Sequence, residues 1–138
     1  MTLLFPQVSE EFEAHLLEIR SHLHAHPELS FQEFQTAAYV TDKLRSFGIT
    51  RIQSVCDTGV IALIEGTNPG KKCIALRADL DALPIQEENE VTYKSKHKGI
   101  MHACGHDVHI TCLLGAAYLL QHTRDQWQGT VKLIFQPG

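Results

Sequence analysis

Residues 51–65 read Arg-Ile-Gln-Ser-Val-Cys-Asp-Thr-Gly-Val-Ile-Ala-Leu-Ile-Glu, and here the sequence changes from a helical to a strand-forming pattern. Two runs rich in β-branched residues, 51–55 and 60–65, predict two strands. After a predicted turn at 68–70, Asn-Pro-Gly, the short apolar run 72–78 predicts a strand that is buried on both faces. A last strand is expected over 130–135.

Two helices are expected before these strands. Ser9 is placed to cap the first, and Pro27 ends it. Its buried stripe has helical spacing and comprises Phe12, Leu16, Ile19 and Leu23. The second helix is expected to open with Ser-Phe-Gln-Glu at 30–33, a capping-box pattern, and to stop at Gly48.

A third helix is expected to begin near Asp107, which would act as its cap, and to run through Leu120. Helices that alternate with strands predict an α/β layered domain. At 138 residues the chain is long enough for one domain with its own core.

Composition excludes several classes of function. The formal charge is -4 and the basic residues are scattered, which argues against a nucleic-acid partner. No apolar run approaches the roughly 20 residues that cross a bilayer, so no membrane partner is expected. Residues 1–6 lack the basic and apolar regions of a secretory signal, which favours a cytoplasmic protein. Three of the four cysteines are expected to be small buried hydrophobic residues with reduced thiols: Cys56, Cys73 and Cys112.

Side chains that can bind a metal are most concentrated at 101–109, which read Met-His-Ala-Cys-Gly-His-Asp-Val-His. In an extended segment His102, Cys104 and His106 point the same way, and they are donors that transition metals prefer. His109 lies one helical turn after His106, as a further ligand, an orienting partner or a substrate contact. Two alternatives stay open: ordinary capping and core hydrogen bonds, or a cysteine nucleophile with a histidine base.

Two other groups of polar residues need an interpretation. Asp79 and Asp81, at the end of a predicted strand, either orient ligand histidines or cap a turn before Pro84. The alternating histidines at 22, 24 and 26 fall at a helix end, where C-terminal capping or a surface position is favoured.

Five stretches of the chain together resemble the N-terminal part of the M20 family of metallopeptidases. Within it they are most similar to the amidohydrolase branch of hippurate hydrolases, N-acyl-amino-acid amidohydrolases and auxin-conjugate hydrolases. The stretches are Leu-His-Ala-His-Pro-Glu-Leu-Ser at 23–30, Arg-Ala-Asp-Leu-Asp-Ala-Leu-Pro at 77–84, the cluster at 101–109, Leu-Leu-Gly-Ala-Ala at 113–117 and Gly-Thr-Val-Lys-Leu-Ile-Phe-Gln-Pro-Gly at 129–138.

The resemblance implies a zinc-peptidase-like layered catalytic domain with a central mixed sheet and flanking helices. It implies that Cys104 and His106 are ligands of a two-metal centre, holding Zn, Mn, Ni or Co, with Asp79 and Asp81 in orienting roles. The substrate would be an N-acyl amino acid, which is hydrolysed to a carboxylate and a free amino acid.

The family continues after Gln-Pro-Gly with Glu-Glu, the first of which is the general base, so the base is expected just after Gly138. Residues 1–138 are therefore expected to form one partial catalytic domain, without the lid domain that mediates dimerisation. The complete protein would be a homodimer or a higher oligomer. The alternative is a truncated, non-catalytic remnant that lacks the base.

Overall fold

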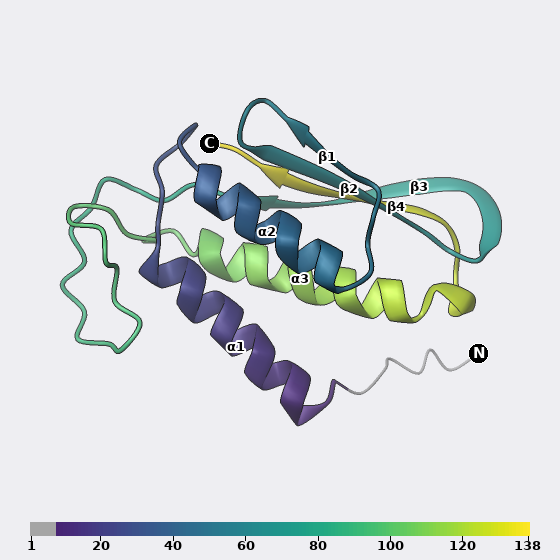
Figure 1. The fold of residues 1–138 in the computed structure, drawn as a ribbon, viewed down its shortest axis with the longest axis horizontal. Helices are drawn as coiled ribbons and strands as arrows, with labels where there is room; N and C mark the ends of the chain where they lie inside the picture. The colour runs from purple at the N-terminus through teal and green to yellow at the C-terminus, as the bar shows by residue number, and fades with distance from the viewer. Residues whose placement is uncertain (1–7) are drawn as a thin grey trace.

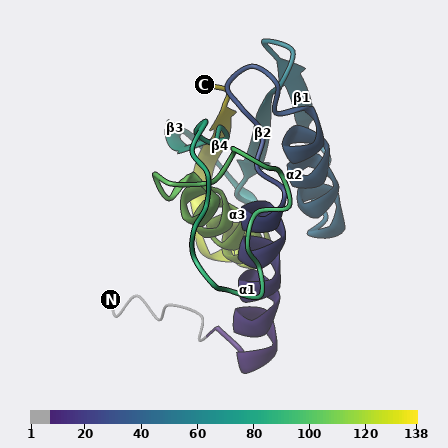
Figure 2. The same ribbon diagram turned by 90° about the vertical axis from the view of Figure 1, so that its left-hand side faces the viewer.

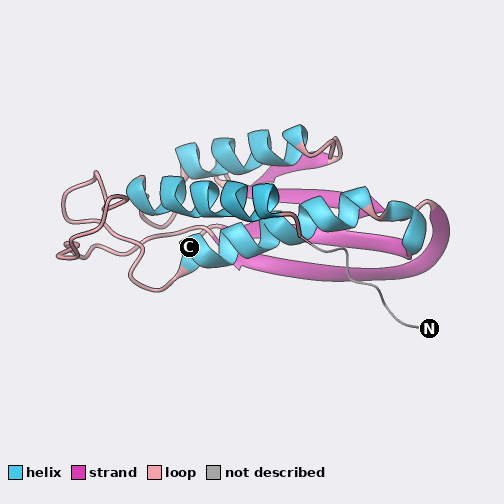
Figure 3. Cartoon of the chain, turned by 90° about the horizontal axis from the view of Figure 1, so that it is seen from below, coloured by secondary structure: helices cyan, strands magenta, loops and turns pink. Residues whose placement is uncertain are grey.

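The computed structural model describes residues 8–138 and consists of a sheet with helices on one face (Figure 1). Along the chain the elements are α1 (Glu10–Ala25), α2 (Phe34–Ser46), β1 (Ile52–Val55), β2 (Gly59–Glu65), β3 (Asn68–Asp79), α3 (His106–His122), a short 3-10 turn (Arg124–Gln126) and β4 (Gln128–Gln136). Helices α2 and α3 lie against the sheet, and α1 packs mainly against α3 (Figures 2 and 3). No helix within residues 8–138 is long and apolar enough to cross a bilayer.

The sheet has the strand order β1-β2-β4-β3 and is mixed. β2 pairs antiparallel with β1 and with β4, whereas β3 pairs parallel with β4. The predicted α/β layered fold with a central mixed sheet is confirmed. Alternate residues of β4 point into the core, which is why Val131, Leu133 and Phe135 are buried.

The start of α1 is as predicted, because Ser9 Oγ accepts a hydrogen bond from the backbone N–H of Phe12 at 3.2 Å. The capping box at 30–33 is wrong, since α2 begins only at Phe34. Glu33 is fully buried, and its carboxylate accepts from Thr58 Oγ1 at 2.7 Å instead. The free N–H groups of the first turn of α2, at Gln35 and Thr36, are bound by the carboxylate of Glu28.

The start of α3 also differs from the prediction. Gly105, with φ at +87°, is the residue that caps the helix, and no side chain takes part. Asp107 lies in the first turn, where its buried carboxylate points away from the backbone N–H groups and accepts hydrogen bonds from α1. Asp107 therefore makes tertiary contacts with α1 and does not cap α3.

β3 departs from the prediction in two ways. The predicted turn at 68–70 lies inside the strand, which begins at Asn68 and has an irregular register between Asn68 and Cys73. Burial on both faces is also wrong, because β3 is an edge strand and residues 71–75 are exposed. Only its end near Ala78 lies under the helices. The apolar run reflects strand formation rather than a central position.

All four cysteines are exposed, so the expectation of buried Cys56, Cys73 and Cys112 is wrong. Cys56 sits in the β1–β2 turn with φ at +49°, and Cys73 lies on the edge strand. Cys112 falls on the solvent side of α3. In each case the local backbone, rather than the hydrophobicity of the thiol, decides its position.

The exposed edge predicts self-association of the 138-residue chain. Ile74 in β3 is 58% exposed beside unpaired backbone groups, which is a template for a further strand. We expect Ile74→Lys to raise the monomer fraction in analytical ultracentrifugation. Leu17→Lys, at a 63% exposed leucine of α1, is the matched control and should change little. An equal effect of both substitutions would contradict a specific role of the edge.

Candidate metal centre

The acidic and imidazole side chains singled out in the sequence meet at one end of the sheet. β3 ends at Asp79, its parallel neighbour β4 ends at Gln136, and α3 begins at His106 beside them (Figure 1). The carboxyl ends of parallel strands are where α/β folds place ligand sites. The sequence-predicted residues from 79–81 and 106–109 are thus brought together by the crossover from β3 to α3.

His106 lies between Asp79, the last residue of β3, and Asp81, two residues further along the chain. Its Nδ1 lies 2.9 Å from both Asp81 Oδ1 and the Asp81 backbone oxygen. Both are acceptors, so Nδ1 carries a proton and donates it, and in the neutral ring the lone pair is then on Nε2. Nε2 faces Asp79 Oδ2 at 3.5 Å. This is the arrangement in which an outer carboxylate fixes the tautomer of a metal-binding histidine.

Asp79, His106 and His109 form a compact group of ligand atoms. Each offers one atom, and these atoms lie within 4.8 Å of one another. His109 Nδ1 is 3.8 Å from Asp79 Oδ2, and Arg77 pairs with the other oxygen of Asp79. Two imidazoles and one carboxylate are a donor set that suits zinc, manganese, cobalt or nickel. The residues present therefore fit a divalent metal.

Cys104 is exposed and lies in the loop that leads into α3, two residues before His106. It is not a member of the Asp79–His106–His109 group. Asp81 contacts Nδ1 of His106 and Asp79 lies at Nε2, and the orienting roles predicted for both aspartates remain predictions. The assignment of Cys104 and His106 as the ligand pair remains a prediction, and the geometry adds Asp79 and His109 as candidates.

His102 is buried, with 5% of its surface exposed, and neither ring nitrogen has a hydrogen-bond partner among the described residues. Burial lowers the pKa of His102 to about 4; Asp107 opposes this shift, while His24 and His106 add to it. The ring is therefore neutral at pH 7. The neutral ring fills space in the interior, beside the charged groups of the site.

A buried network that the sequence did not reveal lies directly behind the site. His24 contacts Asp107 Oδ2 through Nδ1 at 2.8 Å and Glu87 Oε1 through Nε2 at 2.9 Å. Arg20 Nε donates to the same oxygen of Asp107 at 3.1 Å. The surface or capping role expected for His24 is wrong, whereas His26 does cap α1, since its Nδ1 donates to the backbone oxygen of His22.

Glu87 is the residue that sequence analysis missed entirely, because it lies in the irregular polar stretch between the strand and the helix. Burial would raise the pKa of its carboxyl, but hydrogen bonds from Ser95 N–H, His24 and Asn89 lower it to about 2. The residue is 2% exposed. Its neighbours in sequence are mostly exposed, so no periodicity signals its position.

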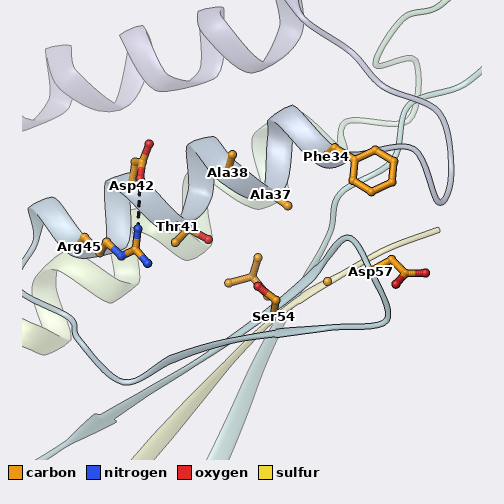
Figure 4. Close-up of a pocket in the computed structure, with 10 residues that line it drawn as sticks. Phe34, Ala37, Ala38, Thr41, Asp42, Arg45, Ser54 and Asp57 are labelled. Carbon is orange, nitrogen blue, oxygen red and sulfur yellow. Dashed lines mark ion pairs between the residues drawn. The ribbon is translucent and has the colours of Figure 1, made fainter.

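A separate cavity of about 320 Å³ lies between α2 and the β1–β2 turn (Figure 4). It is lined partly by small side chains such as Ala37, Ala38 and Thr41, and by an Asp42–Arg45 ion pair at 3.7 Å. The two charges satisfy each other on consecutive turns of one helix. Because these two charges already pair with each other, we assign no function to this cavity.

Comparison with known proteins places this site in a family. The sequence profile described as Peptidase family M20/M25/M40 matches residues 75–138, which include Asp79, Cys104 and His106. The chain belongs to the M20 peptidase family. It is 52% identical over 126 residues to the N-acetyl-L-cysteine deacetylase of Bacillus subtilis, covering 91% of this chain and 30% of that protein.

Other M20 relatives agree in sequence and in structure. The N-acyl-L-amino acid amidohydrolase of Geobacillus stearothermophilus is 47% identical over 127 residues, with 92% of this chain and 34% of that protein covered. The crystal structure of the Bacillus subtilis YXEP protein, described as a dinuclear metal-binding M20 peptidase, superposes with a TM-score of 0.90 at 46% identity. It covers 95% of this chain and 36% of that one. The chain thus spans about a third of the length of these M20 relatives.

The two buried histidines should respond oppositely to replacement by leucine, which has a similar volume. His24→Leu leaves two buried carboxylates short of a partner, so we expect a loss of about 3–5 kcal/mol in the free energy of unfolding. His102→Leu removes two unpaired nitrogens, so the free energy should stay equal or rise. Urea denaturation at pH 7 measures both. A large loss for His102→Leu would show that its nitrogens do have partners.

Acid should destabilise the metal-free protein partly through His102. Its pKa is lower in the folded state, about 4, than the ordinary 6.5. The unfolded chain therefore binds more protons between these values, and stability falls as the pH drops from 6.5 to 4, by roughly 3 kcal/mol at most. His102→Leu should flatten this part of the pH profile of the melting temperature. An unchanged profile would contradict the assignment.

Proposed function

We propose that the whole protein hydrolyses the amide bond of N-acyl amino acids, releasing a carboxylate and a free amino acid. The observation that carries this proposal is the oriented imidazole of His106, with Asp81 on one nitrogen and Asp79 and His109 around the other. In a member of the M20 family this arrangement is suited to hold a divalent metal. The relatives named for N-acetyl-L-cysteine and N-acyl-L-amino acid hydrolysis support the substrate class.

The proposed centre holds two divalent metals, drawn from Zn, Mn, Ni and Co, with Cys104 and His106 as ligands from this chain. The dinuclear YXEP protein, similar to this chain at 46% identity, supports the count of two. Thiolate and imidazole donors favour zinc among these metals. Metals of this kind, when bound, polarise the substrate carbonyl and activate water.

The residues of this chain have separate roles in the proposed reaction. Asp81 keeps the proton on Nδ1 of His106, so that Nε2 stays available as a ligand atom. Ser30 Oγ donates to the other oxygen of Asp81 at 2.9 Å and fixes the orientation of the carboxylate.

Gly138 packs beside the residues that orient His106. Its N–H donates to the buried carboxylate of Glu33 at 2.9 Å, and a Cβ at this position would overlap Ser30 Oγ and approach Asp81. The end of β4 therefore lies against the residue that orients His106. A glutamate that follows Gly138 in the chain starts at the edge of the proposed site.

Residues 1–138 are proposed to be one partial catalytic domain of a homodimer or a higher oligomer, in the cytoplasm. The coverage of 30% of the deacetylase supports the first statement. The competing hypothesis is a non-catalytic remnant of such an enzyme. The reading frame after codon 138 separates the two, because Glu-Glu in frame supports the enzyme and a stop codon supports the remnant.

Metal analysis and hydrolysis assays on this chain, and on a chain extended to the length of its relatives, test the proposal. The extended chain should bind divalent metal and hydrolyse N-acetyl amino acids, lose activity with a chelator and regain it with metal. Asp81→Asn should lower metal affinity or activity by about 10–100-fold. Asp42→Asn, an exposed carboxylate in the Asp42–Arg45 pair, is the control and should change neither.

Two results would contradict the proposal. An extended chain that binds no divalent metal and cleaves no N-acyl amino acid excludes it. A chelator-resistant activity that is abolished by alkylation of thiols supports a cysteine hydrolase instead.

A further inference from the structure

The buried network behind the metal centre joins three segments that are distant in sequence. Arg20 and His24 come from α1, Glu87 from the irregular segment 80–105, and Asp107 from the first turn of α3. The side chains of His24, Glu87 and Asp107 are 6%, 0% and 1% exposed. Arg20 lies partly at the surface.

Both ring nitrogens of His24 face carboxylate oxygens, which accept hydrogen bonds and cannot donate them when ionised. Through these two contacts one planar ring links α3 to the irregular segment. Removing charged groups from water is expensive, and apolar side chains often stabilise a core equally well. Breaking such a network by removing one member is nevertheless costly, because the remaining charges stay buried without a partner.

The irregular segment has several other contacts near Glu87 that depend on the network. Glu87 Oε2 accepts from Ser95 N–H at 2.6 Å, and Glu87 Oε1 accepts from Asn89 Nδ2 at 3.2 Å. The Arg20 guanidinium lies 4.5 Å above the centre of the Tyr93 ring. Figure 2 shows this segment, in teal and green, looped across the ends of α1 and α3.

Both ends of the irregular segment carry residues of the metal centre. Asp81 lies near its beginning, and Cys104, a proposed ligand, lies two residues before the start of α3 at His106. Asp107, which His24 and Arg20 hold, is the immediate neighbour of His106. Glu87 and His24 are therefore connected to the candidate metal centre by two routes, along the segment and through the first turn of α3.

We propose that His24 and Glu87 are positioning residues of the metal centre, which hold Asp81 and His106 in register although neither contacts the metal. This inference rests on the proposed function, because it assigns a role toward a metal at that site. It adds residues of α1 and of the irregular segment, neither of which contributes a predicted metal ligand next to His24 or Glu87, to the set of functional residues.

Binding of Co²⁺ to a chain extended to the length of its relatives tests the inference. The visible absorption of the bound Co²⁺ reports the geometry of its ligands. Glu87→Gln keeps the shape of the side chain and removes its charge, and His24→Gln keeps one hydrogen-bonding group. Both should weaken Co²⁺ affinity by about tenfold or more and alter the spectrum. Val40→Ala, a truncation in the core away from the site, is the control for lost stability.

The outcomes are distinguishable. Weaker binding with an altered spectrum in Glu87→Gln, and an unaltered spectrum in Val40→Ala, supports positioning. Unchanged affinity and spectrum in Glu87→Gln overturns it, even if His24→Gln does not fold. Weakening in all three variants in proportion to their melting temperatures also overturns it. No Co²⁺ binding by the unsubstituted protein overturns the proposed function together with this inference.

Discussion

The hydrogen bond between Asp81 and His106 is the contact on which the functional end of this molecule depends. It joins the segment after β3 to the first residue of α3, across 25 positions of sequence that contain no regular structure. It also fixes which nitrogen of His106 is available to a metal. Ser30 and Gly138 pack on the far side of Asp81, so four separate parts of the chain meet at one carboxylate.

The elements of regular structure could be predicted because their signals are local. The apolar stripe of α1, the capping by Ser9 and the strands β1, β2 and β4 all follow from residues within one element. The predictions of helix starts were wrong where a residue that could cap the helix makes tertiary contacts instead. Glu33 and Asp107 are good capping residues by type, but both are buried and serve distant partners.

The candidate metal centre could be proposed from sequence because its residues cluster in two short motifs. Asp79 and Asp81 lie two apart, and His106 and His109 lie one helical turn apart, so spacing alone places each pair on one face. The network behind the centre carried no such signal. Glu87 is surrounded by exposed polar residues, and its burial results from the path of an irregular segment that no periodicity describes.

The strand order has a consequence for assembly of the chain during synthesis. β4 follows β3 and α3 in the chain yet lies between β2 and β3, so among the described strands β3 has no neighbour until β4 inserts. The early products are expected to be the hairpin of β1 and β2 with the first two helices, since these contacts are close in sequence. The parallel pairing of β3 with β4 spans a long crossover and closes late. Asp79 and Asp81, at and just after the end of β3, therefore gain their fixed surroundings only after β4 has been made, and until then the nascent chain exposes unpaired strand edges that chaperones recognise.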